Sequence, residues 1–386
     1  MVLNQYNFKF MRYLILIVII GVSIACQSKT SDLGDAEIAY SVDTVRIDSK
    51  GRLLDLKRSI LISALDENSK SILLFNENDH SLDEINLDQL EFSGTYPLEV
   101  EGPNGTGKNV NSINLLKDGL LFIKSNVVSA IFNKEGKLLQ RLDWRNSLDS
   151  SGQKYNDVPN TEFLLNSSGL RAFGLNYASG SNKVFLDVLW VQDSIIKRFD
   201  ADPKDSYKSF ILKSEDPQYF ALMNPYVYLG YEGGVITVGH EFSNEITLWD
   251  SDGKFLKTVE YDPNLTPKRV KPSGIVDYPT ADLLFKDYQS YMEQVRFGPP
   301  VWDKVNQRYL RLSAIRKFSE SREEGALVPK NTAEVYLSIF DSDFNLISEV
   351  YVPELDLESK KYFTKDGDLW VFQNLDDELG FLVLSF

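Results

Sequence analysis

A short polar turn between apolar segments recurs along the chain, and this repeat limits the possible fold more than any other feature. Residues 132–139 (FNKEGKLL), 249–256 (WDSDGKFL) and 340–347 (FDSDFNLI) each begin with an aromatic residue, pass through a polar turn and end in an apolar segment. Weaker copies begin at Phe75 and Trp190. Two apolar segments joined by such a turn predict a β-hairpin.

The spacing of the hairpins indicates a larger repeating unit. Their leading aromatic residues stand at positions 75, 132, 190, 249 and 340, which gives three nearly equal steps of 57, 58 and 59 residues and one of 91. A second apolar segment follows a Gly-containing turn in residues 118–123, 233–238 and 366–371. A unit of about four strands that repeats radially is typical of a β-propeller.

We predict an all-β, six-bladed β-propeller, with seven blades as the alternative. Five hairpins account for five blades. The sixth is expected from both ends of the chain, with residues 368–373 and 380–386 as inner strands and residues 40–47 as the outer strand. Such a ring leaves few exposed strand edges.

The long step of 91 residues predicts an insertion at about residues 263–300. A helix is expected from Pro279 and Thr280 to about Arg296, because apolar residues recur there at helical spacing. The apolar positions are Leu284, Tyr288, Tyr291 and Val295. We expect this helix to pack on a blade, and a lid over the central channel is the alternative.

The first 25 residues have the pattern of a signal peptide. Lys9 and Arg12 precede an apolar run at residues 13–20, and no acidic residue is present. The apolar stretch is shorter than the roughly 20 residues that span a bilayer. Ser23-Ile24-Ala25-Cys26 resembles the bacterial lipobox, so we predict cleavage before Cys26 and lipidation of its thiol. Met1 and Met11 both remain candidates for the true start.

The predicted organisation is a signal peptide (1–25), a polar flexible tether (26–39) and a propeller domain (40–386). Gln27 after the lipidated cysteine favours sorting to the outer membrane, facing the periplasm, with surface exposure as the alternative. Because Cys26 is the only cysteine, the chain has no second thiol for an internal disulfide or a thiolate nucleophile.

The charge of the chain excludes some partners. The net charge is −15, and removing residues 1–25, which hold two basic and no acidic residues, makes it −17. We therefore expect no nucleic acid partner, since such binding depends on neutralising phosphates, and no electrostatic docking on anionic lipid.

Several motifs resemble ligand sites but lack an essential part. Residues 102–109 (GPNGTGKN) nearly form a phosphate-binding loop, but Asn109 stands where Ser or Thr would bind magnesium, so we predict a loop between blades and no nucleotide. Asp250 and Asp252 resemble the start of a calcium loop whose twelfth position is Tyr261 rather than an acid, which favours a hairpin turn. His80 and His240 are the only histidines, too few for a usual zinc site. We expect no cofactor and no metal.

One basic and aromatic stretch interrupts the acidic background. Its functional interpretation is a face that binds an anionic or carbohydrate ligand. The competing interpretation, which we favour, is that its arginines point outward from blade strands and pair with acids. The candidate residues are Arg296, Trp302, Arg308, Tyr309 and Arg311, followed by Arg316.

The lipobox, the aromatic-Asp-x-Asp-Gly-Lys hairpins, and Trp302-Asp303 leading to residues 307–311 together resemble an uncharacterised family of six-bladed-propeller lipoproteins of Bacteroidota-type bacteria. The family is a domain of unknown function, so the resemblance implies fold and location and no catalytic residues. From the residues, we favour a non-enzymatic lipoprotein that binds a protein or glycan in the cell envelope. The alternative is a propeller hydrolase or lyase that uses carboxylate or arginine chemistry in its channel.

Overall fold

The computed structural model describes residues 39–178, 183–214, 221–275, 277–320, 331–359 and 361–386. Within these ranges the chain forms six antiparallel sheets of four or five strands, one three-stranded sheet and one α-helix. The predicted all-β, propeller-type class is confirmed. The predicted signal peptide, Cys26 and nearly all of the tether lie outside the described residues. No helix within the described ranges is long and apolar enough to cross a membrane.

The six large sheets are numbered I to VI here, and five of them follow the chain order. Sheets I to III contain β2 (Ser63–Leu65), β3 (Ser71–Asn76), β4 (Ser81–Asn86) and β5 (Glu91–Pro97); β6 (Val110–Leu115), β7 (Leu121–Ser125), β8 (Ser129–Phe132) and β9 (Leu138–Arg141); and β10 (Thr161–Leu165), β11 (Arg171–Ala178), β12 (Lys183–Trp190) and β13 (Ile195–Asp200). Sheets IV and V contain β16 (Val227–Glu232), β17 (Val235–His240), β18 (Ile246–Asp250) and β19 (Phe255–Val259); and β21 (Val295–Phe297), β22 (Val301–Asp303), β23 (Arg308–Phe318), β24 (Asn331–Phe340) and β25 (Leu346–Tyr351).

Sheet VI is built from both ends of the described chain. Its strand order is β1 (Ser41–Arg46), β28 (Glu378–Ser385), β27 (Asp368–Leu375) and β26 (Tyr362–Lys365). β1 pairs antiparallel with β28 from Ser41 opposite Ser385 to Arg46 opposite Gly380, as the sequence predicted. Residues 368–373 and 380–386 lie inside the outer strand β1, as predicted, and β26, which the sequence did not indicate, is the innermost strand.

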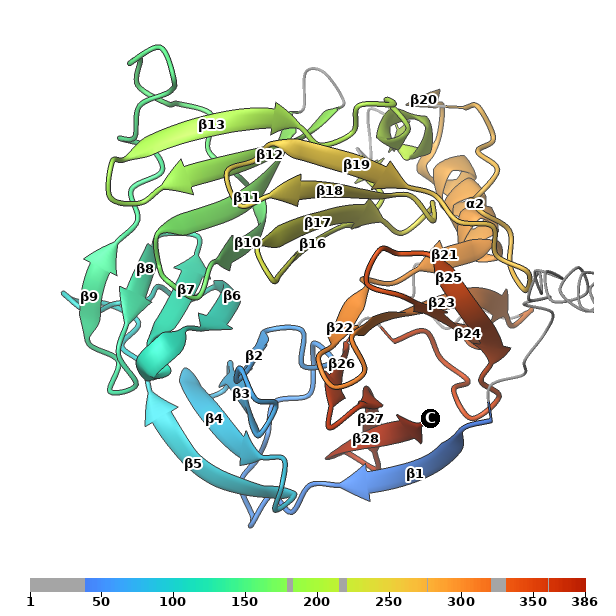
Figure 1. Ribbon diagram of the computed structural model, residues 1–386, viewed down its shortest axis with the longest axis horizontal. Helices are drawn as coiled ribbons and strands as arrows, with labels where there is room; N and C mark the ends of the chain where they lie inside the picture. Colours follow the sequence, from blue (N-terminus) through green and yellow to red (C-terminus); the bar gives the residue numbers. More distant parts are fainter. Residues whose placement is uncertain (1–38, 179–182, 215–220, 276, 321–330, 360) are drawn as a thin grey trace, which may run out of the picture. The chain divides into compact units, whose positions relative to one another are not determined.

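The sheets are arranged in a ring, with β2, β6, β10, β16 and β26 toward the middle (Figure 1). Contacts join β2 to β6, β6 to β10, β10 to β16, and β22 to β26. Six hydrophobic clusters each lie between two neighbouring sheets, including one between sheets VI and I. Because every sheet buries apolar side chains against both neighbours, opening the ring at any point would expose such a cluster to water.

The repeated hairpin motif forms the turn that its sequence predicts. Between β18 and β19, a carboxylate oxygen of Asp250 accepts hydrogen bonds from the backbone N–H of Asp252 (3.0 Å) and Lys254 (2.8 Å). Gly253 has a positive φ of 79°, which a residue without Cβ adopts at little cost. Asp250 and Asp252 therefore belong to a hairpin turn, and the resemblance to a calcium loop is explained by this geometry.

The copy at Phe75 occupies a different place from the other four. Phe132, Trp190, Trp249 and Phe340 lie at or next to the end of the third strand of their sheets, whereas Phe75 lies in the second strand of sheet I. Its hairpin is real, but it joins β3 to β4. The near-equal step of 57 residues was therefore a coincidence, because a local hairpin pattern does not reveal which strands of a sheet it connects.

The insertion before sheet V contains the predicted helix, but the helix is shorter than expected. α2 spans Ala281–Met292, and the hydroxyl of Thr280 accepts a hydrogen bond from the N–H of Leu283 (3.4 Å). Val295 and Arg296 lie in β21, which pairs with β23, so strand pairing ends the helical region early. The helix packs against β20 (Asp277–Tyr278) and β14 (Leu212–Ser214), which forms the small sheet with β15 (Ala221–Met223).

Two short 3₁₀ helices complete the described elements: η1 (Lys117–Gly119) and η2 (Tyr207–Phe210).

Candidate functional site

Polar side chains from sheets far apart in the sequence meet at the starts of the inner strands. Glu162 lies in β10, Tyr226 directly precedes β16, and Lys361 directly precedes β26. Each of these strands is the innermost of its sheet, and the next strands along the chain pair with it antiparallel and then outward. The starts of the three strands therefore lie at the same end of the ring. We call Glu162, Tyr226 and Lys361 the axial cluster.

Hydrogen bonds link the axial cluster to three inner strands. The Tyr226 hydroxyl donates to Oε1 of Glu162 at 2.5 Å. The Lys361 Nζ donates to the backbone oxygen of Ser63, the first residue of β2, at 3.5 Å. One bond joins sheets III and IV and the other joins sheets VI and I, while Glu162 and Lys361 influence each other through their charges.

Glu162 owes its position to an irregular backbone. The pairing of β10 with β11 shifts between Thr161 and Phe163, and Glu162 in the bulge has a positive φ of 45°. A bulge redirects a side chain out of the strand's regular alternation. A positive φ is costly for a residue with a side chain, and such backbone is concentrated at functional sites.

Burial shifts the proton affinity of both ionisable ends of the axial cluster. It raises the pKa of Glu162, which the Tyr226 hydrogen bond and the charge of Lys361 only partly offset. Burial also lowers the pKa of Lys361 to about 8, with a smaller opposing effect from Glu162. Within the described part of the chain, Lys361 makes no ion pair within 4.0 Å. The cluster therefore has an acid and a base whose charges are incompletely compensated.

A cavity of 290 Å³ lies along the inner strands. Ser63, whose carbonyl receives the Lys361 hydrogen bond, is one of its lining residues, and β2, β6, β10 and β16 all contribute. Most lining side chains are apolar, such as Leu115, Leu164 and Leu229. Ser63, Asn114 and Tyr231 add polar groups to the wall.

A second charged group lies in sheet V and its surroundings. Arg296 pairs with Glu241 and, through Nη1, with Glu358 at 2.9 Å. Arg316 Nη2 pairs with the same Glu358 oxygen at 2.6 Å. We call Glu241, Arg296, Arg316 and Glu358 the arginine cluster. Arg296 and Glu241 each expose 2% of their side chains, so these charges are compensated within the protein rather than by water.

The arginine cluster holds part of the axial cluster in place. Oε1 of Glu241 accepts a hydrogen bond from the backbone N–H of Tyr226 at 2.8 Å, and the N–H of Glu241 donates to the Tyr226 carbonyl at 3.0 Å. A continuous path therefore runs from Arg296 through Glu241 and Tyr226 to Glu162. The buried pairs fix the backbone from which the Tyr226 ring, 38% exposed, reaches Glu162.

The candidate residues predicted from the sequence make separate contacts in the structure. Arg311 is 1% exposed and donates to the carbonyls of Gly298 (2.8 Å) and Asn244 (3.0 Å). The prediction of outward-pointing arginines is therefore wrong for Arg311 and for Arg296, because both are buried. The expected pairing with acids holds for Arg296 and Arg316, whereas Arg311 pairs with carbonyls.

The remaining candidates have structural partners near the other end of β23. Arg308 Nε pairs with Asp303 at 2.8 Å, and its guanidinium lies 5.0 Å from the centre of the Phe386 ring. Trp302 contacts Tyr309 with ring centres 4.7 Å apart, and Tyr309 stacks on Phe344 at 4.0 Å. Of the five candidates, only Arg296 lies next to the axial cluster.

The other motifs take the local forms expected of them. Residues 102–109 form a loop that leads into β6 rather than a helix, as predicted. His80 donates or accepts a 2.7 Å hydrogen bond with the Thr106 hydroxyl, and His240 ends β17. The described residues contain no group of three or more His, Cys, Asp or Glu side chains arranged to hold a metal.

Sequence reasoning missed all three residues of the axial cluster. Glu162 and Lys361 have no motif around them, and the bulge that redirects Glu162 depends on pairing with β11. The pair Tyr226 and Tyr228 flanking Val227 was the one local signal, since alternating tyrosines in a strand indicate one aromatic face.

Comparison with known proteins places this chain among domains of unknown function. A family model described as a domain of unknown function, DUF4221, matches residues 35–351. The crystal structure of a DUF4221 family member from Bacteroides vulgatus is similar, with a TM-score of 0.63 and 12% identity over 90% of this chain and 97% of that one. These matches confirm the resemblance drawn from the sequence. A search of curated proteins finds no match.

Two further structures are similar at lower scores. A putative exported protein from Bacteroides fragilis has a TM-score of 0.49 and 10% identity over 90% of this chain and 95% of that one. The β-propeller domain of Cps50 (Swd1) from Myceliophteria thermophila has a TM-score of 0.38 and 9% identity over 87% of this chain and 98% of that one.

Proposed function

The chain belongs to DUF4221, a family of domains of unknown function, and we propose that it is a cell-envelope lipoprotein that binds an acidic glycan at the axial cluster without transforming it. The observation that carries this proposal is the meeting of Glu162, Tyr226 and Lys361 at the starts of the inner strands, where Lys361 bonds to Ser63 of the cavity wall. These groups offer the three kinds of contact that an acidic sugar needs.

The chemistry of each group matches one part of such a ligand. The exposed face of Tyr226 can stack on the apolar C–H face of a sugar ring, since aromatic rings combine apolar area with a polar end. Glu162 accepts hydrogen bonds from hydroxyl groups, and the Lys361 ammonium attracts a carboxylate. At neutral pH Lys361 is largely protonated, because its pKa is about 8.

Binding is favoured over glycan hydrolysis because too few carboxylates are free for the reaction. A glycosidase usually places two carboxyl groups about 5–10 Å apart on either side of the scissile bond. Glu241 and Glu358, the acids nearest to Tyr226 and Arg296, are held in buried pairs. Glu162 accepts a hydrogen bond from Tyr226 and makes no ion pair within 4.0 Å among the described residues.

The proposed location depends on the N-terminal sequence. Lipid on Cys26 would hold the domain at the outer membrane on the periplasmic side, while Cys26→Ser should release the protein from the membrane fraction. Membrane fractionation with palmitate labelling measures both effects. Continued membrane retention and labelling of Cys26→Ser would contradict the anchor.

Isothermal titration of the full-length lipoprotein in detergent, with neutral and uronic-acid oligosaccharides, tests glycan binding. We expect the acidic sugars to bind, and Lys361→Met to weaken them by roughly tenfold or more, as expected for loss of a charged hydrogen bond. Lys365→Met is the matched control, because Lys365 ends β26, the strand that Lys361 precedes, but pairs with Asp88 at 2.7 Å. Equal binding of the acidic sugars by both variants would overturn the assignment of the site. Capture of an envelope protein by a chain that binds none of the sugars would also overturn it.

The raised pKa of Glu162 supports one alternative, a lyase or hydrolase that uses Glu162 as a general acid. The same sugars incubated with the protein would then yield shorter or unsaturated products. Glu162→Gln would abolish this turnover while leaving binding nearly intact, whereas a binding protein gives no product with either chain.

A further inference from the structure

Lys361 has no carboxylate partner in the described part of the chain. Its Nζ makes one hydrogen bond there, to the backbone oxygen of Ser63, at the long distance of 3.5 Å, and no ion pair within 4.0 Å. The residue is partly exposed, so a small molecule can approach it from solvent. A lysine nitrogen whose ammonium form is not held by a carboxylate can lose its proton and act as a nucleophile.

The hydrogen-bond pattern of β2 places this nitrogen on the side of the strand that faces the middle of the ring. The N–H of Phe75 donates to the oxygen of Ile62 at 3.0 Å. The N–H of Asp66 donates to the oxygen of Ser71, also at 3.0 Å. In an antiparallel pair only alternate residues bond to the partner strand, so Ser63 directs its carbonyl away from β3 and toward the middle. Ser63 also lines the cavity of 290 Å³.

The carboxyl group of Glu162 reaches the same cavity wall from another inner strand. It accepts hydrogen bonds from the Tyr226 hydroxyl and from the backbone N–H of Leu229. Backbone bonds to β17 begin at Tyr226, which accepts from Glu241, and recur at every second residue. The N–H of Leu229 therefore points away from β17, and Leu229 lines the cavity. An amine and a carboxyl group thus both bond to backbone groups that face the middle of the ring.

Burial increases the fraction of Lys361 that is a neutral amine. It lowers the pKa of Lys361 to about 8, so about a quarter of this side chain is neutral at pH 7.5. An ordinary exposed lysine, with a pKa near about 10.4, is neutral to only about one part in a thousand at that pH.

We propose that Lys361 forms a reversible imine with the aldehyde group of a small ligand, either a free hydroxyaldehyde or the open-chain end of a reducing sugar. The nitrogen adds to the carbonyl carbon, and the resulting carbinolamine loses the former carbonyl oxygen as water, together with the two protons of the amine. Nothing is oxidised or reduced, and hydrolysis returns the aldehyde unchanged. Glu162 is the carboxyl group that can give the departing hydroxyl its proton. This bond goes beyond the non-covalent glycan binding proposed above and does not depend on it.

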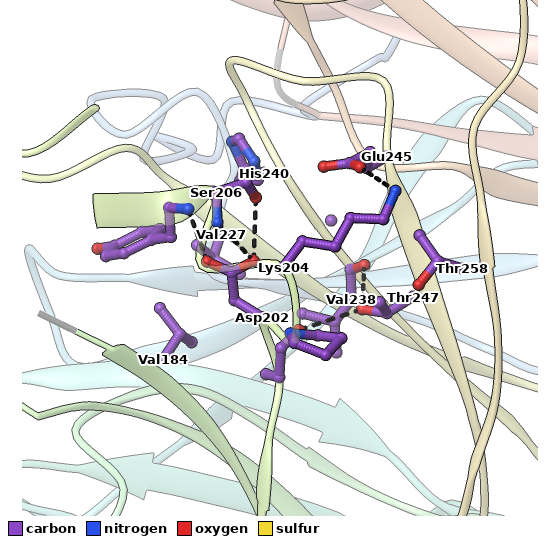
Figure 2. A pocket seen from close by; sticks show the side chains of 14 residues that line it. Val184, Asp202, Lys204, Ser206, Val227, Val238, His240, Glu245, Thr247 and Thr258 are labelled. Atoms are coloured by element: carbon purple, nitrogen blue, oxygen red, sulfur yellow. Dashed lines mark hydrogen bonds and ion pairs between the residues drawn. The ribbon is translucent and has the colours of Figure 1, made fainter. Parts of the chain in front are cut away.

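Two lysines that are held by carboxylates serve as internal controls. Lys204 lines a smaller cavity, between sheets III and IV, where it is half exposed and pairs with Glu245 at 2.6 Å (Figure 2). The hydrogen bond to Glu245 raises the pKa of Lys204. Lys365 ends β26, and its hydrogen bonds to Asp366 and Asp88 outweigh burial and raise its pKa. Both lysines are therefore protonated at neutral pH.

Reductive trapping in the full-length lipoprotein in detergent tests the proposal, with glycolaldehyde and glucuronic acid as probes. Cyanoborohydride reduces an imine to a stable secondary amine, and peptide mass spectrometry locates the modified lysine. At pH 7.5 we expect Lys361 to be modified at least about tenfold faster than Lys204 or Lys365, because far more of it is neutral. The probe with the larger ratio of Lys361 to control modification identifies the source of the aldehyde. Modification of Lys361 no faster than these controls would overturn the proposal.

The same reaction in urea shows whether the fold causes the difference. In the unfolded chain all three lysines should be modified at similar rates, since the cavity and the ion pairs are lost. An advantage of Lys361 that persists in urea would trace its reactivity to the local sequence and would overturn the proposed site.

Methyl glucuronide separates the imine from glycan binding, because it carries the sugar carboxylate but no aldehyde. Titrated binding of methyl glucuronide without preferential modification of Lys361 by either aldehyde would overturn the imine and leave the glycan proposal standing. Preferential modification of Lys361 without such binding would support the imine and count against the glycan proposal.

Discussion

The arginine cluster and the axial cluster contain similar side chains but differ in how their charges are paired. In the arginine cluster, Arg296 contacts two carboxylates and Glu358 contacts two arginines. In the axial cluster, Glu162 meets a tyrosine hydroxyl, and Lys361 meets a backbone carbonyl. Compensated charges stabilise one arrangement of the chain, whereas uncompensated ones are available to a ligand.

The backbone adds a second difference between the two clusters. Arg296 and Arg316 lie in the regularly paired strands β21 and β23, while Glu162 lies in a bulge with positive φ. The backbone strain at Glu162 lies next to charges that are incompletely paired. Both features cost stability, which indicates that the axial cluster was not optimised for stability alone. The following experiments test this distinction through the free energy of unfolding.

The largest effect is expected from Arg296→Met in the arginine cluster. The substitution leaves Glu241 and Glu358 buried with less compensation, which should lower the free energy of unfolding by about 3–5 kcal/mol. Urea denaturation measures the loss. Lys208→Ala breaks an exposed pair with Asp205 and serves as the control, with an expected change below about 0.5 kcal/mol. Similar losses in both variants would remove the distinction between buried and exposed pairs.

Lys361→Met should change how the free energy of unfolding depends on pH. Because the pKa of Lys361 is lowered to about 8, the unfolded chain binds a proton between pH 8 and about 10.5 that the folded chain does not. Stability from this group therefore rises with pH across that window, by roughly 3 kcal/mol. Unfolding at several pH values should show this rise in the wild type and its loss in Lys361→Met.

Lys365→Met should change the pH dependence of stability in the direction opposite to that of Lys361→Met. Hydrogen bonds to Asp366 and Asp88 outweigh the burial of Lys365 and raise its pKa. The stability that Lys365 contributes is fully present below the pKa that this lysine has in the unfolded chain. It is lost as the pH rises through the pKa that the lysine has in the folded chain. If the two lysine variants changed the pH profile in the same direction, the assignment of an uncompensated charge to Lys361 would be wrong.

Glu162→Gly should relieve the strain in the bulge. Glycine adopts φ near 45° without a Cβ clash, so we expect a gain of about 1 kcal/mol in stability together with loss of glycan binding. Thr161→Gly, at the neighbouring position in the same strand, should instead lower stability by up to about 1 kcal/mol. Denaturation and titration of both variants measure the trade-off, and a destabilised Glu162→Gly would argue against strain at this residue.

Glu162→Gln should have the smallest effect on stability. Burial already raises the pKa of this carboxyl, and glutamine keeps an oxygen that accepts from Tyr226. We expect a change within about 0.5 kcal/mol at neutral pH, measured by urea denaturation. A loss as large as that of Arg296→Met would mean that Glu162 is part of the structural network.

The sequence by itself determined the local features of this protein. Asp250 and Gly253 form their turn through contacts within five residues, and the segment at residues 366–371 begins a second strand as its counterparts at residues 118 and 233 do. Closure of the ring by residues 40–47 was also predictable. This alternating strand near the N-terminal end needs a hydrogen-bonding partner, and in a closed ring a strand at the C-terminal end supplies it. Each of these follows from turn chemistry or from the period of apolar residues.

Only the tertiary structure decided which residues share a site. Glu162, Tyr226 and Lys361 are far apart in the chain, and they meet because three inner strands begin at one end of the ring. The same dependence explains why Phe75 was assigned to the wrong strand and why Arg296 lies in a strand rather than a helix. Strand order, bulges and burial are set by pairing and packing between distant segments, which no local pattern of residues encodes.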